Sequence, residues 1–141
     1  MHHIDRRTSW EEAWEAFQVL INQAKIGYVG SCNFAGWHLM EAQSMAKAWG
    51  MVGLVCEQHR YSLLCRMPEL EVLPAARHLG IGGIAYSPLG AGLLSGNVLN
   101  PATGSRTAVM MANSIPKYRE QLERYSVLCQ DLGDKETDMA L

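Results

Sequence analysis

Apolar side chains recur every three or four residues between positions 10 and 21, which predicts a helix with one apolar face. Ser9 and Glu12 have the spacing of a capping box at its start. A second helical pattern covers residues 39–49, and Gly50 follows it as a left-handed terminator. The apolar positions of the two helices are Trp10, Ala13, Trp14, Phe17, Leu20 and Ile21, then Leu39, Ala42, Met45, Ala46 and Trp49.

Short apolar runs between these patterns predict strands at residues 26–30, 52–56 and 81–86. A third helix is predicted over 69–79 with Gly80 at its end, although Pro74 moves its proper start to about residue 73 or 74. The intervals between the strand starts are similar, and each interval contains a helix. This spacing is typical of βα units with parallel strands, in a doubly wound sheet or a (β/α) barrel, and the pattern does not choose between the two.

A fourth helix is predicted from residue 115 to 132, with Ser114 and Pro116 as start signals and Gly133 as its end. Its apolar stripe consists of Ile115, Tyr118, Leu122, Tyr125, Cys129 and Leu132. A further helical pattern begins at Thr137 and ends with the sequence at Leu141 after about one turn.

The composition adds limits on class and partners. The chain has 141 residues, of which 48% are hydrophobic and 18% charged, as in a globular domain with a sizeable core. Its formal net charge of -2 gives no electrostatic reason to expect a nucleic acid or an anionic membrane as partner. Small-molecule and protein partners remain open.

The four cysteines and the amino terminus indicate the compartment. Cys32, Cys56, Cys65 and Cys129 are widely and irregularly spaced, which fits neither a CxxC metal site nor a dense disulfide framework. The residues MHHIDRR lack a following apolar h-region, and no stretch approaches the ~18 apolar residues of a membrane span. We therefore expect a soluble cytoplasmic protein with reduced thiols, no metal and no membrane association.

Polar or glycine-rich residues follow each predicted strand, where ligands bind in both candidate architectures. These segments are residues 31–33, 57–59 and 87–92. Short polar side chains can hydrogen-bond an amide or a phosphate, glycines let backbone N–H groups approach an anion, and Tyr86 offers a ring for stacking. The alternative is that Ser and Asn only shape turns. The glycines also lack GxGxxG spacing. The sequence predicts a small-molecule site at this rim.

Three segments resemble successive segments of the aldo-keto reductases in their amino-acid sequence, their order and their spacing. They are residues 25–34 (KIGYVGSCNF), 57–64 (EQHRYSLL) and 85–96 (AYSPLGAGLLSG). The resemblance extends over essentially the whole chain. It implies a partial TIM (β/α)8 barrel of about four βα units with parallel strands, so that residues 1–141 form an incomplete aldo-keto reductase domain.

The resemblance also implies a cofactor, NADPH/NADP, and residues that hold it. Cys32, Asn33 and Gln58 would face the nicotinamide carboxamide, and Tyr86 would stack on the nicotinamide ring. The pyrophosphate would be wrapped by the loop that contains Ser87, Pro88, Leu89, Gly90 and Gly92 and that continues to Gly96.

Catalysis in the family uses Tyr as proton donor with Asp, Lys and His around it, and the first three would lie on segments before Met1. His2 fits the position of the family's histidine, because Asp5 follows it at the matching spacing. His3 is the second candidate, and a chance or vector-derived histidine pair is the alternative. Metal ligation by the pair is not expected, since no further ligand lies at a usual spacing.

Two positions depart from the family's pattern. Cys32 stands where the family usually has Ser, and a thiol is a weaker donor and acceptor than a hydroxyl. Ala24 stands where Gly is usual; if this site is left-handed, the change costs on the order of 1 kcal/mol.

The resemblance implies an NADP(H)-dependent oxidoreductase whose intact parent reduces aldehydes and ketones by hydride transfer. The chain alone is expected to be inactive, and self-association is expected through the exposed edges of an incomplete barrel. The alternative is a non-catalytic nucleotide-sensing or protein-interaction module on a degraded reductase scaffold. A third interpretation is an unrelated (β/α) barrel with a phosphate-binding rim.

Overall fold

The computed structural model describes residues 1–96 and 113–141 of the chain. These residues form two compact units. The first unit consists of Met1–Arg60 and Arg66–Tyr86, and the second consists of Tyr61–Cys65 and Ser87–Leu141. The predicted site residues are divided between them, because Tyr86 ends the first unit and Ser87 begins the longer segment of the second.

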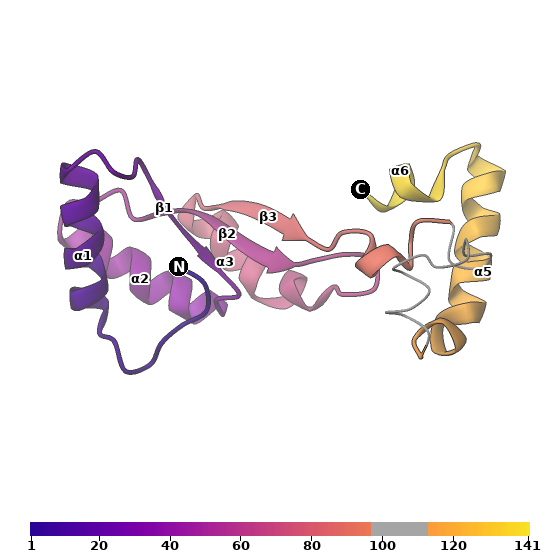
Figure 1. Cartoon of the computed structure of the whole chain (residues 1–141), viewed down its shortest axis with the longest axis horizontal. Coiled ribbons are helices and arrows are strands. Elements are labelled where there is room, and N and C mark those ends of the chain that lie inside the picture. The colour runs from indigo at the N-terminus through magenta and orange to yellow at the C-terminus, as the bar shows by residue number, and fades with distance from the viewer. Residues whose placement is uncertain (97–112) are drawn as a thin grey trace. The chain divides into compact units, whose positions relative to one another are not determined.

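The first unit contains a three-stranded parallel sheet (Figure 1). Its strands are β1 (Val29–Cys32), β2 (Leu54–Arg60) and β3 (Gly82–Tyr86), and they lie side by side in the order of the sequence. A helical segment connects each strand to the next, as parallel pairing requires. The predicted α/β class with parallel strands is therefore confirmed for this unit.

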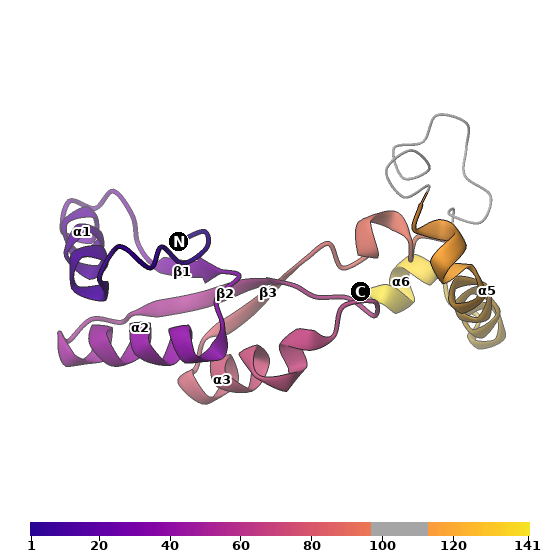
Figure 2. The same cartoon turned by 90° about the horizontal axis from the view of Figure 1, so that it is seen from below.

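The helices of this unit are α1 (Trp10–Asn22), α2 (Gly36–Ala48) and α3 (Val72–Leu79), with a short 3₁₀ helix, η1 (Met67–Leu70), before α3. Figure 2 shows α2 and α3 on the same side of the sheet. Residues of α1, α2, α3, the strands and the adjoining turns form the core. Its buried residues are Trp14, Val29, Phe34, Leu39, Ala42, Ala46, Leu54, Val72, Ala76 and Ile81. In Figure 2, none of the labelled helices of this unit lies over the opposite side of β2 and β3.

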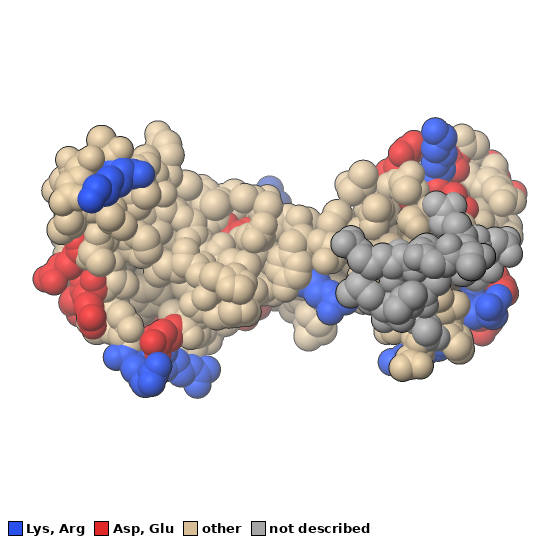
Figure 3. Space-filling view, viewed as in Figure 1, with Lys and Arg blue, Asp and Glu red and all other residues tan. Residues whose placement is uncertain are grey.

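The register of the strands gives the sheet two different faces. Cys32 pairs with Gln58, one position beyond the pair of Ser31 and Glu57. Because side chains alternate along a strand, Ser31 and Glu57 lie on the face covered by helices, whereas Cys32 and Gln58 lie on the opposite face, which we call the open face. Cys32 is nevertheless buried, and His2 pairs with it. Glu57 is only 2% exposed, and Gln58 is exposed. Figure 3 shows few charged side chains on the open face over the strands.

Gly30 of β1 lies close to Cys56 of β2, with which it pairs. A Cβ atom on Gly30 would lie 2.4 Å from Cys56 Sγ, a distance that side chains do not tolerate. The Cys56 thiol therefore fills the space that a side chain on Gly30 would need. None of the four cysteines, all of which lie within the described residues, forms a disulfide.

The strand boundaries differ from the prediction, most of all in β1 and β2. Strand β1 was expected at residues 26–30, but pairing begins at Val29, and Tyr28 lies before the strand with 72% of its surface exposed. Strand β2 was expected to end at Cys56, but it continues to Arg60. Residues 57–59, which were expected to form a loop, are therefore strand residues that alternate between the two faces.

The helix boundaries follow the predicted signals more closely. Ser9 Oγ accepts the Glu12 N–H at 3.2 Å at the start of α1, and Gly50 after α2 and Gly80 after α3 are left-handed, with φ of 70° and 71°. The third helix begins only at Val72, which leaves Pro74 in its first turn, where a missing N–H has no cost.

The second unit is built around α5 (Ile115–Leu132), together with η2 (Gly90–Gly92) and α6 (Glu136–Ala140). The bounds of α5 agree with the prediction, and Gly133 ends it with φ 74°, whereas Ser114 makes no side-chain cap bond. Leu93, Leu94 and Leu122 form the buried cluster of this unit. The Tyr125 hydroxyl donates to the Glu136 carbonyl, and burial raises the pKa of Tyr125 to about 12.

Candidate functional site

Four of the predicted cofactor residues form one chain of side-chain hydrogen bonds where the strands of the first unit end. The Tyr86 hydroxyl donates to Asn33 Oδ1 at 2.9 Å, and Asn33 Nδ2 donates to Cys32 Sγ at 3.2 Å. The Cys32 thiol in turn donates to Gln58 Oε1 at 3.6 Å. We call Cys32, Asn33, Gln58 and Tyr86 the strand-end cluster. It links the carboxyl-terminal parts of β1, β2 and β3.

The backbone of Asn33 is left-handed, with φ 60°, immediately after β1 ends. Asn tolerates this conformation better than most residues other than glycine. The Asn33 N–H donates to the Gln58 carbonyl at 2.9 Å, so the turn is attached to the neighbouring strand. This conformation places the Asn33 side chain in contact with Cys32 and Tyr86.

The strand-end cluster has donors and acceptors that fit a carboxamide ligand. Gln58 Oε1 accepts from Cys32, and Gln58 Nε2 has no protein partner within the described residues. Asn33 Nδ2 uses one of its two N–H bonds for Cys32. An amide ligand at this edge can therefore receive N–H donors from both side chains, beside the Tyr86 ring.

Glu57 lies on the covered face directly behind this cluster. Its carboxylate accepts the Phe34 N–H at 2.9 Å, the Ser31 hydroxyl, and His59 Nδ1–H at 3.2 Å. The sequence pattern places Glu57 with Gln58 in a polar segment after the strand and indicates no separate role for Glu57. The available signal was the period of two, which separates neighbouring residues once β2 is extended through Arg60.

His2, the predicted catalytic residue, lies on a segment that runs parallel to β1. His2 forms an isolated parallel bridge with Cys32, the His3 N–H donates to the Cys32 carbonyl at 3.1 Å, and the Met1 amino group donates to the Gly30 carbonyl. This pairing puts His2 in register with Cys32, at the end of the strands where the cluster lies. Its catalytic role stays a prediction.

The remaining predicted cofactor residues are in the second unit: Ser87, Pro88, Leu89, Gly90 and Gly92. Four residues of this loop have positive φ, namely Ser87 (54°), Gly90 (58°), Ala91 (57°) and Gly92 (96°). The Gly90 N–H donates to the Ser87 carbonyl at 2.9 Å, and the Gly92 N–H donates to the Leu89 carbonyl at 3.0 Å. The loop is thus tightly wound, and its contact with a pyrophosphate stays a prediction.

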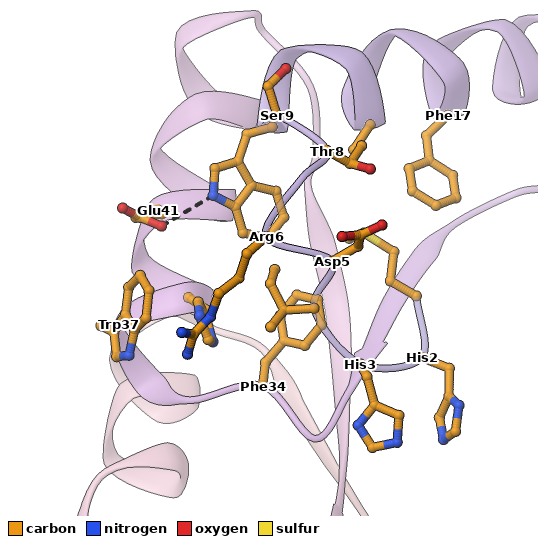
Figure 4. Close-up of a pocket in the computed structure, with 15 residues that line it drawn as sticks. His2, His3, Asp5, Arg6, Thr8, Ser9, Phe17, Phe34, Trp37 and Glu41 are labelled. Atoms are coloured by element: carbon orange, nitrogen blue, oxygen red, sulfur yellow. Dashed lines mark hydrogen bonds between the residues drawn. The ribbon is translucent and has the colours of Figure 1, made fainter.

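A cavity of about 540 Å³ lies elsewhere in the first unit, among residues 1–10, α1 and α2 (Figure 4). Trp10, Phe34 and Trp37 line it, and in Figure 4 the imidazoles of His2 and His3 point away from these rings. None of the strand-end cluster residues lines this cavity.

His38 also lines the cavity and is the one side chain of the described residues with a buried polar atom lacking a partner. Its Nδ1 accepts the Ala35 N–H at 3.2 Å, so Nε2 carries the proton of the neutral ring. Burial lowers the pKa of His38, which is 6% exposed, below its usual value. The nearby Glu41 carboxylate works in the opposite direction. His38 therefore favours the neutral form.

Within residues 1–96 and 113–141, no three or more His, Cys, Asp and Glu side chains gather as metal ligands would. None of the helices described for these residues is long and apolar enough to cross a membrane.

Comparison with known proteins gives a consistent family. A sequence model of the Aldo/keto reductase family matches residues 1–141. The chain is 56% identical over all 141 residues to "Uncharacterized oxidoreductase YrpG" of Bacillus subtilis (strain 168), of which it covers 43%. Over 96 residues, 68% of the chain, it is 34% identical to mouse "Aflatoxin B1 aldehyde reductase member 2", of which it covers 26%. The human protein of that name is also 34% identical over 96 residues, with 27% covered. The chain thus spans less than half the length of these relatives.

Proposed function

The chain belongs to the aldo/keto reductase family, and from this premise we propose that it is part of an NADP(H)-dependent oxidoreductase that reduces aldehydes or ketones. The strand-end cluster carries the proposal. Cys32, Asn33, Gln58 and Tyr86 come from separate strand ends and are joined by hydrogen bonds at one edge of a parallel sheet. In this proposal the sheet is a section of a (β/α)8 barrel, and residues 1–141 are an incomplete reductase domain.

The strand-end cluster holds the nicotinamide end of the cofactor. Gln58 Nε2 and Asn33 Nδ2 donate to the carboxamide oxygen, and the Tyr86 ring provides the apolar surface on which the nicotinamide lies. The hydrogen bond from the Tyr86 hydroxyl to Asn33 supports this role, because it fixes the Asn33 amide. When bound, the cofactor supplies the hydride.

The loop of residues 87–92 holds the pyrophosphate. Its left-handed residues, Ser87, Gly90, Ala91 and Gly92, turn the backbone tightly, as in backbone turns that bind anions. The Gly90 and Gly92 N–H groups bind carbonyls within the loop, so other N–H groups of the loop would face the pyrophosphate. Gly90 suits this role further because a Cβ there would lie 3.0 Å from Leu64 Cδ1.

Proton transfer depends on residues beyond those of this chain. His2, with His3 as the second candidate, matches the histidine of the family's catalytic set and would orient or polarise the carbonyl oxygen. Two of the tyrosines are poor proton donors: the Tyr86 hydroxyl is bound to Asn33, and burial raises the pKa of Tyr125 to about 12. The chain alone therefore binds cofactor without turnover.

Small carbonyl compounds are the proposed substrate class. The names of two relatives describe reduction of an aldehyde, and a carbonyl carbon is the hydride acceptor that the family's chemistry requires.

The test is a titration of the purified chain with NADPH and, in parallel, with NADH, followed by nicotinamide fluorescence. We expect saturable binding that is tighter for NADPH, and no oxidation of NADPH when an aromatic aldehyde is added. Absence of binding contradicts the proposed cofactor site. Turnover by the chain alone contradicts the assignment of proton transfer, and tight binding without turnover by an intact parent favours a nucleotide sensor.

A further inference from the structure

The carboxylate of Glu57 is buried and has both oxygens engaged. Oε1 accepts from the Phe34 N–H at 2.9 Å and from His59 Nδ1 at 3.2 Å, and Oε2 accepts from the Ser31 hydroxyl. Only 1% of the side chain is exposed. A carboxylate in such a place is unfavourable unless its hydrogen bonds compensate for lost hydration. This set of bonds indicates a specific role for the group.

The backbone amide that Glu57 binds belongs to the residue directly after Asn33. The turn after β1 is therefore held twice by consecutive residues of β2. The Asn33 N–H binds the Gln58 carbonyl at 2.9 Å, and the Phe34 N–H binds the Glu57 carboxylate. The two bonds reach the same stretch of strand, and they hold the backbone on both sides of the Asn33 side chain.

Phe34 fixes the turn on its other side. Its ring is fully buried and packs edge-on against Trp10, with the ring centroids 5.9 Å apart. The left-handed backbone of Asn33 is thus enclosed between a strand and a core aromatic residue. A conformation of this kind persists only where its surroundings enforce it.

We propose that Glu57 is a positioning residue, which holds the turn after β1 through the Phe34 N–H so that the Asn33 side-chain amide points at the cofactor's carboxamide. The inference rests on the proposed function, because the ligand of Asn33 is the nicotinamide proposed above. Glu57 lies on the covered face and contacts neither the open face nor the ligand. It acts through the backbone of Phe34 and through Ser31, which precedes Cys32.

Glu71 provides a matched control. Its carboxylate accepts the Trp37 N–H at 3.2 Å, at the start of α2. Both carboxylates therefore bind a backbone amide near the same turn. Only Glu57 binds the amide next to Asn33.

The experiment compares Glu57→Leu, Glu57→Gln and Glu71→Leu in the full chain. The first readout needs no cofactor: it is the NMR signals of the Asn33 side-chain amide and the hydrogen-exchange rate of the Phe34 backbone amide. We expect Glu57→Leu to shift the Asn33 signals and to accelerate Phe34 exchange at least tenfold, because the amide loses its acceptor. Glu57→Gln keeps an acceptor oxygen and restores both readouts, and Glu71→Leu leaves both unchanged.

The second readout is NADPH affinity, which we expect to fall about tenfold in Glu57→Leu and to stay within about twofold in the other two variants. Unchanged Asn33 signals in Glu57→Leu, or equal changes in Glu57→Leu and Glu57→Gln, overturn the positioning role. If Glu57→Leu does not fold, the wild-type chain decides, since a Phe34 amide that exchanges as fast as an exposed amide is incompatible with the proposal. Failure of the wild-type chain to bind NADPH contradicts the proposed function, and the cofactor-free readouts still decide the role of Glu57.

Discussion

The two turns that flank β1 have nearly the same backbone conformation but different surroundings. Ala24, before the strand, has φ 54°, and Asn33, after it, has φ 60°. The Ala24 turn ends α1 by backbone bonds alone, from Ala24 N–H to the Ile21 carbonyl at 2.8 Å and from Lys25 N–H to the Leu20 carbonyl at 3.0 Å. The Asn33 turn adds side-chain bonds to Cys32 and Tyr86.

This difference separates two uses of a left-handed residue. At Ala24 the conformation only ends a helix, a purpose for which glycine is better suited, and the methyl group adds strain. At Asn33 the same conformation places the side-chain amide that we propose binds the cofactor, so in this proposal the side chain matters more than the strain. In the proposed function, the turn before β1 affects the stability of the fold, whereas the turn after β1 affects cofactor binding.

The largest effect is expected for Phe34→Ala, which tests how strongly Phe34 anchors the turn after β1. Phe34→Ala removes a fully buried ring from the core, and we expect the free energy of unfolding to fall by roughly 3–5 kcal/mol, measured by urea denaturation. The control is Tyr28→Ala at the amino end, where the side chain is exposed and a change within about 0.5 kcal/mol is expected. Similar losses in the two variants would mean that Phe34 does not anchor the turn.

A matched pair of glycine substitutions tests the two uses directly. Ala24→Gly relieves strain and should raise the free energy of unfolding by up to about 1 kcal/mol, without changing NADPH affinity. Asn33→Gly also relieves strain but removes the side-chain bonds, so we expect stability to stay level or fall and NADPH affinity to drop about tenfold. Urea denaturation and NADPH titration measure both quantities. A gain in stability without loss of affinity in Asn33→Gly contradicts the functional role of that turn.

The smallest expected effect is a pH dependence confined to the carboxyl-end turn. Burial lowers the pKa of His38 below the value of about 6.5 that the unfolded chain has, so the unfolded state binds more protons between those two values. The contribution of neutral His38 to the free energy of unfolding should therefore be fully present above about pH 6.5. It should be lost as the pH falls from about 6.5 through the lowered pKa of His38. Protonation also removes the Nδ1 acceptor of the Ala35 N–H.

Urea midpoints between pH 5 and 8 measure this dependence. His38→Gln should flatten the decline on the acidic side, whereas His78→Gln, a substitution at a histidine in the last turn of α3, should leave it as in the wild type. An identical pH profile in His38→Gln would show that other groups cause the decline.

The sequence predicts most clearly the parts of the fold that local signals control. The bounds of α1 and α5 follow from their apolar stripes with the Ser9 cap and the Gly133 terminator, because caps and periodicity act within one element. The strand pattern predicted an end of β2 at residue 56, because the polar run EQHR that follows is typical of loops. In the structure this run continues the strand to Arg60. Tyr28 was expected in a strand because of its β propensity, but pairing with β2 begins one residue later.

For the site, the resemblance selected the open-face residues, and the structure brings Cys32, Asn33, Gln58 and Tyr86 together at one edge. The role of the covered face was not accessible from the sequence. Glu57 is next to Gln58 in the chain, and only the register with Ser31 and the position of the Phe34 amide distinguish its function from that of its neighbour.

The contact between Gly30 and Cys56 constrains how this chain can change over evolution. A Cβ atom at position 30 would collide with the Cys56 sulfur, so a side chain at position 30 requires the Cys56 side chain to move or to become smaller. The two positions lie on different strands, with all of α2 between them in the sequence, yet the residue at one of them limits the choice of residue at the other. Among homologous chains we expect glycine at position 30 wherever position 56 carries cysteine or a larger residue.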